Sequence, residues 1–471
     1  MAFESDRGFG SRGWGKYSLQ SALAIGSVLL FICSNLKHAL FQSTAFDLSV
    51  FDQAIYLLSQ GEPPLSSLLG FHILGDHAAF ILYPLALLYK IYPDVRWLFA
   101  LQAIALSCGA VLVHRLAVEA GLHRTRGGLV AIAYLLYPLI FNINLFDFHP
   151  DVFIPAGLLA AVWSARRERL GGFVLAIALV LSCKAVVSLT VAAMGVWLCF
   201  DPKRRSYGAI ALLAGGAWFF IATQIVIPTF GGEMASVGRH LWRYAYLGDS
   251  FSAIFRNVLV RPQLILSRLF SFDTFRYLFT LIFPVLWGLS PRHLAPLTSA
   301  IPALLLNLLA DDPLQRDVIH QYSLPILPFL FLAVISTLAA GERWRIRGRT
   351  IVLWSAIAFF GLAKHYYFVR YFSTIDTWSA KRDAIAQIQP DARVLTDNPL
   401  APHLAHRPIL QLINIPLSPA ELAEFDSILI NLRRPWPHNI EQATTLTKHF
   451  LAHPQYRLRY QHNGIYLFER S

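Results

Sequence analysis

The chain has 471 residues, of which 55% are hydrophobic and only 14% charged, with a formal net charge of +12. A soluble globular protein carries about 25% charged residues, and here long apolar runs take the place of that charge. Residues 371–471 hold 10 Lys and Arg against 9 Asp and Glu, so the positive excess lies in short loops between apolar runs. This distribution indicates membrane topology and argues against a nucleic-acid partner.

The first apolar run, residues 17–41, follows the basic residues Arg7, Arg12 and Lys16. It is too long for a signal-peptide core and lacks a small-residue cleavage site, so we interpret it as a retained transmembrane helix. Ten further runs approach the roughly 20 residues that cross a hydrocarbon core. They are residues 95–117, 127–143, 151–165, 170–184, 186–200, 206–229, 274–289, 293–310, 320–340 and 349–369.

Basic clusters between these runs set the predicted orientation, because short loops rich in Lys and Arg stay in the cytoplasm. With a cytoplasmic N-terminus, every such cluster falls on the cytoplasmic side. After the N-terminal cluster they are Arg115/Arg124/Arg126, Arg166/Arg167/Arg169, Lys203/Arg204/Arg205, Arg292 and Arg343/Arg345/Arg347/Arg349. The chain is therefore predicted to be a multi-pass membrane protein.

Two segments depart from a regular span. Residues 77–92 are apolar but include Pro84, and a full crossing would move the next basic loop outside, so we expect a re-entrant or interfacial segment. Residues 170–200 lie between two basic clusters that must both be on the cytoplasmic side of the membrane. Two short helices meeting near Lys184, with the turn inside a protein-lined cavity, satisfy that requirement.

Residues 371–471 have the character of a soluble domain. Strand patterns are predicted at residues 393–396, 408–412, 427–432, 456–460 and 465–469, with a helix at 441–453. The odd number of spans places this part outside the cytoplasm. The fold class is therefore an all-α membrane domain of about 11 transmembrane helices (1–370, with a first outer loop at 43–94) followed by a small extracytoplasmic α/β domain (371–471).

Two aspartates follow the first span closely, Asp47 and Asp52 in Phe46-Asp-Leu-Ser-Val-Phe-Asp-Gln. Five residues apart on a helix, they do not quite share a face, so we expect one to face a cavity and the other to be structural. A carboxylate here is a candidate general base toward an acceptor hydroxyl, and both are candidate catalytic residues. Capping of a juxtamembrane helix by Asp47 is the alternative.

Other polar residues are predicted to approach the same outer surface, where ionisable groups near membrane depth are costly and therefore functional candidates. The candidates for substrate binding are Asp76, His77, Asp147, His149, Lys184, Arg243, Tyr244, His320, Tyr322, His365 and Arg370. The alternative for each one is a solvated loop residue.

Three of these, Asp76, His77 and Asp147, are also candidate ligands of a divalent cation, since carboxylate and imidazole groups suit such ions. Their spacing matches no metal motif, and helix capping is the alternative. Lys184, Arg243 and Arg370 are suited to a phosphate, although Lys184 could instead snorkel toward the interface. Tyr244 could stack on a sugar or serve as an interfacial anchor.

Four segments together resemble a bacterial family of predicted membrane proteins of unknown function. They are Phe46-Asp-Leu-Ser-Val-Phe-Asp-Gln, Leu74-Gly-Asp-His77, Asn144-Leu-Phe-Asp-Phe-His-Pro150 and His320-Gln-Tyr-Ser-Leu-Pro-Ile-Leu-Pro328. The resemblance covers most of residues 30–370 and extends to the tail. That family in turn resembles the GT-C superfamily of glycosyltransferases, which take a sugar from a polyprenyl-phosphate donor in the membrane.

The superfamily's spacing of an acid, an alanine and a glycine recurs as Asp47, Ala54 and Gly61. The resemblance implies that Asp47 is the catalytic base and that Asp76-His77 takes the place of an acid or histidine before an apolar segment. Lys184 corresponds to a lysine at the outer end of a helix pair. Acidic residues are expected after that lysine, whereas Ala185 and Val186 follow here, which is a departure at the place of a metal or donor contact.

The function implied by this resemblance is transfer of a sugar from a polyprenyl-phosphate donor to an envelope or lipid acceptor at the extracytoplasmic face of the bacterial inner membrane. Membrane lipid and the lipid-linked donor are the expected partners, and the oligomeric state stays open. One alternative is a transporter or flippase of lipid-linked substrates, a class with repeated halves and polar residues at the bilayer midplane. The other is a non-catalytic envelope assembly protein with the tail as its binding module.

Overall fold

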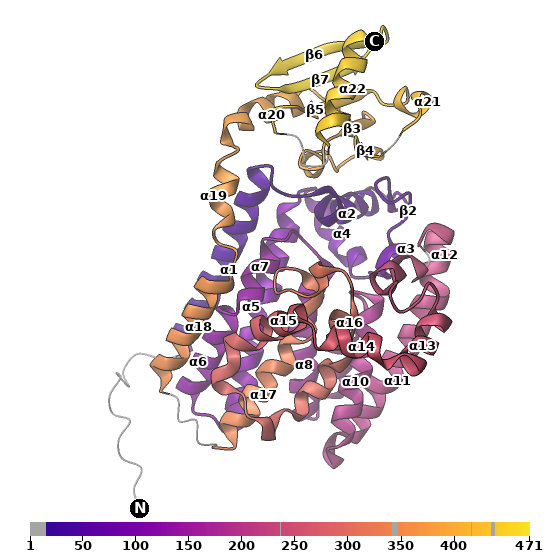
Figure 1. Cartoon of the computed structure of the whole chain (residues 1–471). Helices are drawn as coiled ribbons and strands as arrows, with labels where there is room; N and C mark the ends of the chain where they lie inside the picture. Colours follow the sequence, from indigo (N-terminus) through magenta and orange to yellow (C-terminus); the bar gives the residue numbers. More distant parts are fainter. Residues whose placement is uncertain (1–15, 236, 342–346, 416, 435–438) are drawn as a thin grey trace, which may run out of the picture.

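The structure is a computed structural model that describes residues 16–235, 237–341, 347–415, 417–434 and 439–471. A helical bundle carries a smaller domain with a β-sheet at one end, and the first helix starts near the other end (Figure 1). We call the end beside the sheet domain the outer end and the other the inner end. The N-terminal basic residues Arg7 and Arg12, like Arg343 and Arg345, fall outside the described residues.

The first half of the bundle alternates long helices with short ones. Its helices are α1 (Lys16–Ala39), α2 (Val50–Gln60), α3 (Leu74–His77), α4 (Leu82–Ile91), α5 (Arg96–Glu119), α6 (Arg124–Leu135), α7 (Pro138–Asn144), α8 (Ile154–Arg166), α9 (Leu170–Leu181), α10 (Ser188–Cys199), α11 (Arg205–Ile221) and α12 (Ile227–Gly231). A π-helical turn, η1 (Ala45–Ser49), leads into α2, and a two-stranded ribbon, β1 (Leu65–Ser66) with β2 (Phe71–His72), follows it.

The second half contains more breaks. Its helices are α13 (Phe251–Val260), α14 (Pro262–Leu269), α15 (Phe272–Ile282), α16 (Ile301–Leu309), α17 (Leu327–Ala339), α18 (Gly348–Leu362) and α19 (Tyr367–Phe372). Short 3-10 turns join helices in both halves: η2 (Pro150–Phe153), η3 (Ala185–Val187), η4 (Pro202–Arg204), η6 (Gly232–Ala235), η7 (Val237–Tyr244), η8 (Phe283–Gly288), η9 (Pro291–His293), η10 (Ala295–Ala300), η11 (Pro313–Gln315) and η12 (Gln321–Ser323). A second π-helical turn, η5 (Ala222–Val226), lies between α11 and α12.

The predicted number of eleven spans is not confirmed. Within the described residues, four helices are long and apolar enough to cross a membrane, or up to six if each of two bent helix pairs is one span. Proline explains much of the difference, because it removes a backbone donor and clashes with the preceding turn. Pro138 sits at the 43° bend between α6 and α7, for example, where the sequence suggested one continuous helix.

The two irregular segments have the predicted short helices. α4 has 10 residues and is therefore about 15 Å long, half of a hydrocarbon core, so it is too short to cross. Residues 170–200 form α9 and α10, each of 12 residues, with Lys184 in the break between them. α10 then packs closely on α11, where a Cβ added to Gly215 would lie 2.6 Å from the Ala192 nitrogen, so only small residues allow this crossing.

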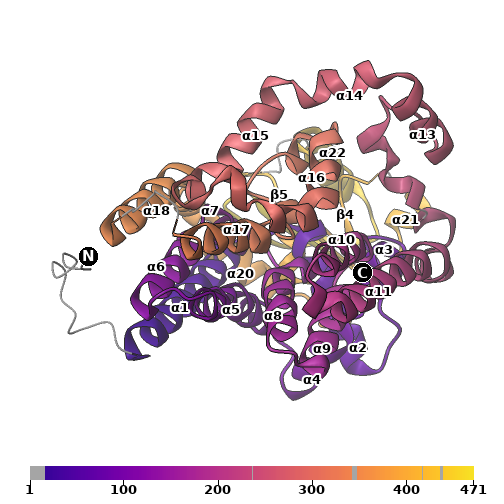
Figure 2. The same cartoon turned by 90° about the horizontal axis from the view of Figure 1, so that it is seen from below.

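α13, α14 and α15 form an arc that stands away from the rest of the bundle (Figure 2). Large apolar side chains are exposed along it, including Phe255, Phe270 and Phe272. The arc is tied back to the bundle by an ion pair between Arg268 of α14 and Asp311, which lies just beyond α16. Exposed apolar residues on short helices are typical of segments that lie at a membrane interface.

The described part of the tail forms a five-stranded sheet in the order β4-β3-β5-β7-β6. The strands are β3 (Val394–Thr396), β4 (Leu410–Leu412), β5 (Ser427–Asn431), β6 (Tyr456–His462) and β7 (Ile465–Arg470). β3 pairs in parallel with β4 and β5, whereas β7 pairs antiparallel with β5 and β6. All five strands and the helix α22 (Ile440–Ala452) confirm the sequence prediction within two residues at each end.

Alternation along the strands gives the sheet two buried faces. Leu395, Ile428 and Phe468 point into a core that includes Phe450 of α22. Their neighbours Val394, Leu429 and Leu467 point the other way, into a core shared with the helix α20 (Trp378–Ile385) and continuous with the bundle. The second face therefore joins the sheet to the outer end of the helices. The tail also has two short helical pieces, η14 (Ala401–His403) and α21 (Pro419–Leu422), and a turn η13 (Ile375–Thr377) before α20.

Candidate functional site

Asp47 lies in η1, directly after the outer end of α1, and its side chain is 29% exposed. The Thr44 hydroxyl donates a hydrogen bond to Asp47 Oδ2 at 2.6 Å, and His149 Nε2 lies 3.5 Å from Oδ1. Burial by itself would raise the pKa of the Asp47 carboxyl. The hydrogen bonds from His149 and Thr44 and the charges of His149 and Lys37 outweigh burial and hold that pKa below its usual value.

Asp52, one turn further along in α2, is enclosed instead. Its side chain is 2% exposed and accepts hydrogen bonds from the Tyr89 hydroxyl at 2.6 Å and from His406 Nε2 at 3.1 Å. Burial lowers the pKa of His406, but the charge and hydrogen bond of Asp52 outweigh it and raise that pKa overall. Of these two aspartates Asp47 is therefore the accessible one, whereas Asp52 ties α2 to α4 and the tail.

In the loop after α7, every second residue from Asp147 to Asp151 contacts another part of the chain. Asp147 Oδ2 accepts from Lys37 Nζ at 2.7 Å and from the Thr44 backbone at 3.1 Å. His149 faces Asp47, and Asp151 Oδ1 lies 3.4 Å from Lys184 Nζ. His149 is extended, so residues on either side of it alternate in direction. A five-residue segment therefore connects the first outer loop to the break between α9 and α10.

Lys184 and Arg243 converge on Tyr322. Lys184 Nζ lies 5.6 Å from the centre of the Tyr322 ring, and the Arg243 guanidinium lies 5.5 Å from it while donating to the Tyr322 hydroxyl at 3.2 Å. Asp312 Oδ2 lies 3.3 Å from Arg243 Nε. Two cations from distant parts of the chain thus share one aromatic ring, an arrangement suited to a phosphate.

His320 joins this group through Phe146. Its ring packs edge-on against Phe146 with 4.3 Å between centroids, and Phe146 stacks on His149 at 5.2 Å. His320 Nδ1 lies 2.7 Å from Asp317 Oδ2. Asp47, His149 and His320 are therefore neighbours in one cluster at the outer end of the bundle, although the first and the last of them lie more than 270 residues apart in sequence.

Three predicted site residues lie apart from this cluster or support it from behind. The Tyr244 hydroxyl donates to the Leu306 carbonyl at 3.1 Å and thus holds η7 against α16. His365 and Arg370 are exposed at the outer end of α18 and in α19. His365 contacts the rings of Phe360 and Tyr366. No contact that the described residues make joins His365 or Arg370 to Asp47 or Lys184.

The three candidate metal ligands do not form one group. Asp76 and His77 lie 3.3 Å apart in α3, whereas Asp147 is bound to Lys37. Within the described residues, no group of three or more His, Cys, Asp or Glu side chains could hold a metal ion. α3 is instead positioned by packing, since a Cβ on Gly75 would lie 2.5 Å from the Gly231 Cα.

Several residues of the site were missed by sequence reasoning. Lys37 lies inside the first apolar run and was counted as part of the span, although a charge at the outer end of a helix could have indicated a partner. The tail supplies Asn398, whose Oδ1 accepts from the Ala45 backbone at 2.9 Å, and His406. Asn398 follows the carboxyl end of β3 in the parallel part of the sheet, where ligand-contacting residues of such sheets gather.

The arrangement joins a partly exposed carboxylate to a pair of cations. A carboxylate with a lowered pKa is ionised at neutral pH and can accept a proton. Lys184 and Arg243 are cations that can bind an anionic group, and each has an acid partner, Asp151 at 3.4 Å and Asp312 at 3.3 Å respectively. Fold and site together define a polytopic membrane protein with a partly exposed carboxylate and a pair of cations at one end of its bundle.

Comparison with solved structures identifies the same fold elsewhere. ArnT from Cupriavidus metallidurans bound to undecaprenyl phosphate aligns with a TM-score of 0.55 and 10% identity, over 96% of this chain and 98% of that chain. The apo structure of that protein aligns with a TM-score of 0.48 and 10% identity, over 94% and 98% of the two chains. The first alignment shows a shared fold and supports the resemblance to the GT-C superfamily.

The family of the chain follows from its sequence. Residues 37–467 match the family of predicted membrane proteins DUF2079, so the chain belongs to that family. The resemblance predicted from the four sequence segments is thus confirmed. No curated protein sequence matches the chain.

Proposed function

We propose that the protein is a membrane glycosyltransferase that moves a sugar from a polyprenyl-phosphate donor to a hydroxyl of an envelope or lipid acceptor. The observation that carries the proposal is Asp47, an ionised and partly exposed carboxylate held by Thr44 and His149 in the first outer loop. A fold shared with ArnT, whose structure contains undecaprenyl phosphate, supports a polyprenyl-phosphate partner.

In the proposed reaction Asp47 accepts the proton of the acceptor hydroxyl. The hydroxyl oxygen bonds to the anomeric carbon of the sugar as the bond between that carbon and the donor phosphate oxygen breaks. Polyprenyl phosphate leaves with one more negative charge than it carried in the donor. Lys184 and Arg243 stabilise that charge, with His320 as a further donor beside Phe146.

The remaining residues position these groups. Asp147 fixes the start of the first outer loop through its contacts with Lys37 and the Thr44 backbone. Asp151 holds the Lys184 side chain in place through its contact with the ammonium group. Asp52 acts as a positioning residue because it is enclosed by Tyr89 and His406. His365 and Arg370, exposed at the same end of the bundle, are proposed to contact the acceptor or the lipid headgroup region.

The proposed topology has eleven crossings, with a cytoplasmic N-terminus and the tail outside the cytoplasm. Residues 1–370 form the membrane domain, with the first outer loop at 43–94, and residues 371–471 form the extracytoplasmic domain. The basic residues Arg115, Arg167 and Lys203, which lie near the inner end of their helices, support this orientation. A reporter that is active only outside the cytoplasm, fused after Ser471, should be active, and an inactive reporter contradicts the topology.

Transfer from radiolabelled polyprenyl-phosphate sugars to lipid or envelope acceptors, measured with the purified chain in lipid, tests the proposal. Asp47→Asn should reduce the rate by about 10²–10⁴-fold, the usual contribution of a general base. Glu62→Gln, which removes an exposed acid of the same loop, is the matched control and should leave the rate unchanged. Wild-type chain without transfer from any donor, or full activity in Asp47→Asn, contradicts the proposal and favours an assembly protein.

A further inference from the structure

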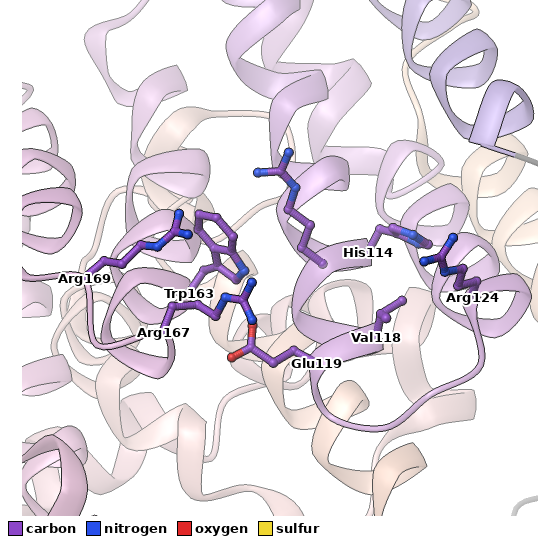
Figure 3. Close-up of a pocket in the computed structure, with 8 residues that line it drawn as sticks. His114, Val118, Glu119, Arg124, Trp163, Arg167 and Arg169 are labelled. Atoms are coloured by element: carbon purple, nitrogen blue, oxygen red, sulfur yellow. The ribbon is translucent and has the colours of Figure 1, made fainter.

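A cavity of about 570 Å³ lies at the inner end of the bundle, away from the proposed reaction site. It is lined by the last turns of α5, the first residue of α6, and the end of α8 with the turn that follows (Figure 3). α5 begins at Arg96 beside the first outer loop and has 24 residues, so its end lies about 36 Å from that loop. No step of the proposed reaction uses this cavity.

Positive charge dominates the lining. Among the described residues that line the cavity, Arg115, Arg124, Arg167 and Arg169 face the single acid Glu119. Even with one guanidinium neutralised by Glu119, three positive charges remain in a space large enough for a small ligand. An anion is therefore the ligand that this cavity favours.

Trp163 orders two of these arginines. The guanidinium carbon of Arg115 lies 5.1 Å from the centre of the Trp163 ring, and that of Arg169 lies 5.7 Å from it. The two arginines come from different elements, α5 and the turn before α9, so the ring holds them beside one another. A guanidinium stacked on an aromatic face keeps its N–H donors available for a phosphate.

The surroundings favour a phosphate carried by a lipid. α9 starts directly after Arg169, and its first turns expose Leu170, Val174 and Leu175. An apolar surface for acyl chains is thus continuous with the charged cavity. Tryptophan is also typical of the level of lipid headgroups, and basic pockets between transmembrane helices bind anionic headgroups.

We propose that the cavity formed by α5, α6 and α8 binds the phosphate headgroup of an anionic phospholipid, with Arg115 and Arg169 as its main donors. The lipid belongs to the leaflet at the inner end of the bundle. Arg124 and Arg167 contribute further charge, and Trp163 forms the wall against which the headgroup rests.

The test is native mass spectrometry of the full-length chain in detergent, titrated with phosphatidylglycerol or phosphatidylcholine. The wild-type chain should retain phosphatidylglycerol preferentially. Arg115→Gln with Arg169→Gln should weaken that retention by about tenfold or more, as expected for two lost charge-assisted contacts. Equal retention of the two lipids by the wild-type chain overturns the proposal.

Two further variants separate a built site from general attraction. Lys203→Gln with Arg205→Gln removes the same charge from the same end of the bundle outside the cavity and should change retention less than about twofold. Arg115→Lys with Arg169→Lys keeps the charge but loses the planar donors, so retention should still fall severalfold. Equal losses in the Gln pairs, or no loss in the Lys pair, overturn the proposal.

Two controls complete the experiment. If the double variant fails to fold, the single variant Arg124→Gln takes its place. It alters an exposed residue at the start of α6 and should weaken retention of phosphatidylglycerol by about threefold. Glycerol phosphate, the headgroup without chains, should compete only weakly with phosphatidylglycerol. Competition as strong as that of the lipid overturns the lipid assignment in favour of a free phosphate ligand.

Discussion

The two ends of the helical bundle differ in how their positive side chains are neutralised. At the outer end three cations each have an acid partner: Lys37 with Asp147, Lys184 with Asp151, and Arg243 with Asp312. At the inner end four arginines of one cavity face one glutamate. Burying an ion pair costs desolvation free energy, so such a pair is expected where it holds side chains in a fixed geometry. Positive charge in excess of the nearby acids can instead attract an external anion. The cations of the outer end are therefore held in place by their acids, whereas the inner end keeps an excess of positive charge.

Breaking the most buried pair should have the largest effect. Lys37→Met leaves Asp147 as an unpaired charge that is 2% exposed, so the free energy of unfolding should fall by about 3–5 kcal/mol. Lys37→Met with Asp147→Asn should restore part of it, because Asn carries no charge, keeps an acceptor for the Thr44 backbone N–H and tolerates the positive φ of 83° at this position. Denaturation in detergent measures both. A single variant as stable as the wild type would show that this pair does not hold the first outer loop.

Removing one cation of the proposed phosphate-binding pair should have a smaller and more selective effect. Arg243→Ala loses the contact with Tyr322 and a charged donor, so kcat/KM for the lipid-linked donor should fall by about 10–100-fold. Arg268→Ala, which breaks the ion pair between α14 and Asp311, is the control for loss of a cation in the same region. Steady-state kinetics in lipid measure the difference, and equal effects would remove Arg243 from the site.

The tail should give the smallest effect, a dependence of its stability on pH. Burial raises the pKa of Asp397 to about 7, although Asn431 donates to it, and burial lowers the pKa of Lys381 to about 8. A raised acid pKa stabilises the fold below about pH 4, and this contribution is lost as pH rises to about 7. The lowered lysine pKa costs stability below about pH 8, and that cost disappears toward pH 10.5.

The tail should therefore be least stable between about pH 7 and pH 8, with slopes of at most about 1.4 kcal/mol per pH unit on either side. Hydrogen exchange of the β3 and β5 amides measures it. Asp397→Asn should flatten the acid side while leaving the alkaline side. A profile that instead rises from pH 4 to 7 would contradict the assignment.

Local patterns in the sequence were enough to predict the tail strands and the two short helices around Lys184. Period-two alternation and the constraint on the flanking basic clusters involve only neighbouring residues. The count of eleven crossings needed more, because Pro138 and similar residues divide apolar runs that look continuous. Hydropathy alone does not show where such a run bends.

Sidedness in the sequence grouped the candidate site residues but did not predict their pairs. Asp47, His149, Lys184, Arg243 and Tyr322 do come together, since loops at one end of a bundle share one surface. Lys37 was missed because its partner Asp147 lies 110 positions away. His365 and Arg370 were grouped with the site from their sidedness alone, which does not define where a side chain points.

The most direct test of the proposed site is a cryo-electron microscopy structure of the chain in lipid with undecaprenyl phosphate bound. We predict density for the phosphate between Lys184 and Arg243, with its oxygens about 3 Å from both side chains and on the same side of the bundle as Asp47. Phosphate density elsewhere, with Lys184 still in contact with Asp151 and Arg243 still in contact with Asp312, would contradict this account.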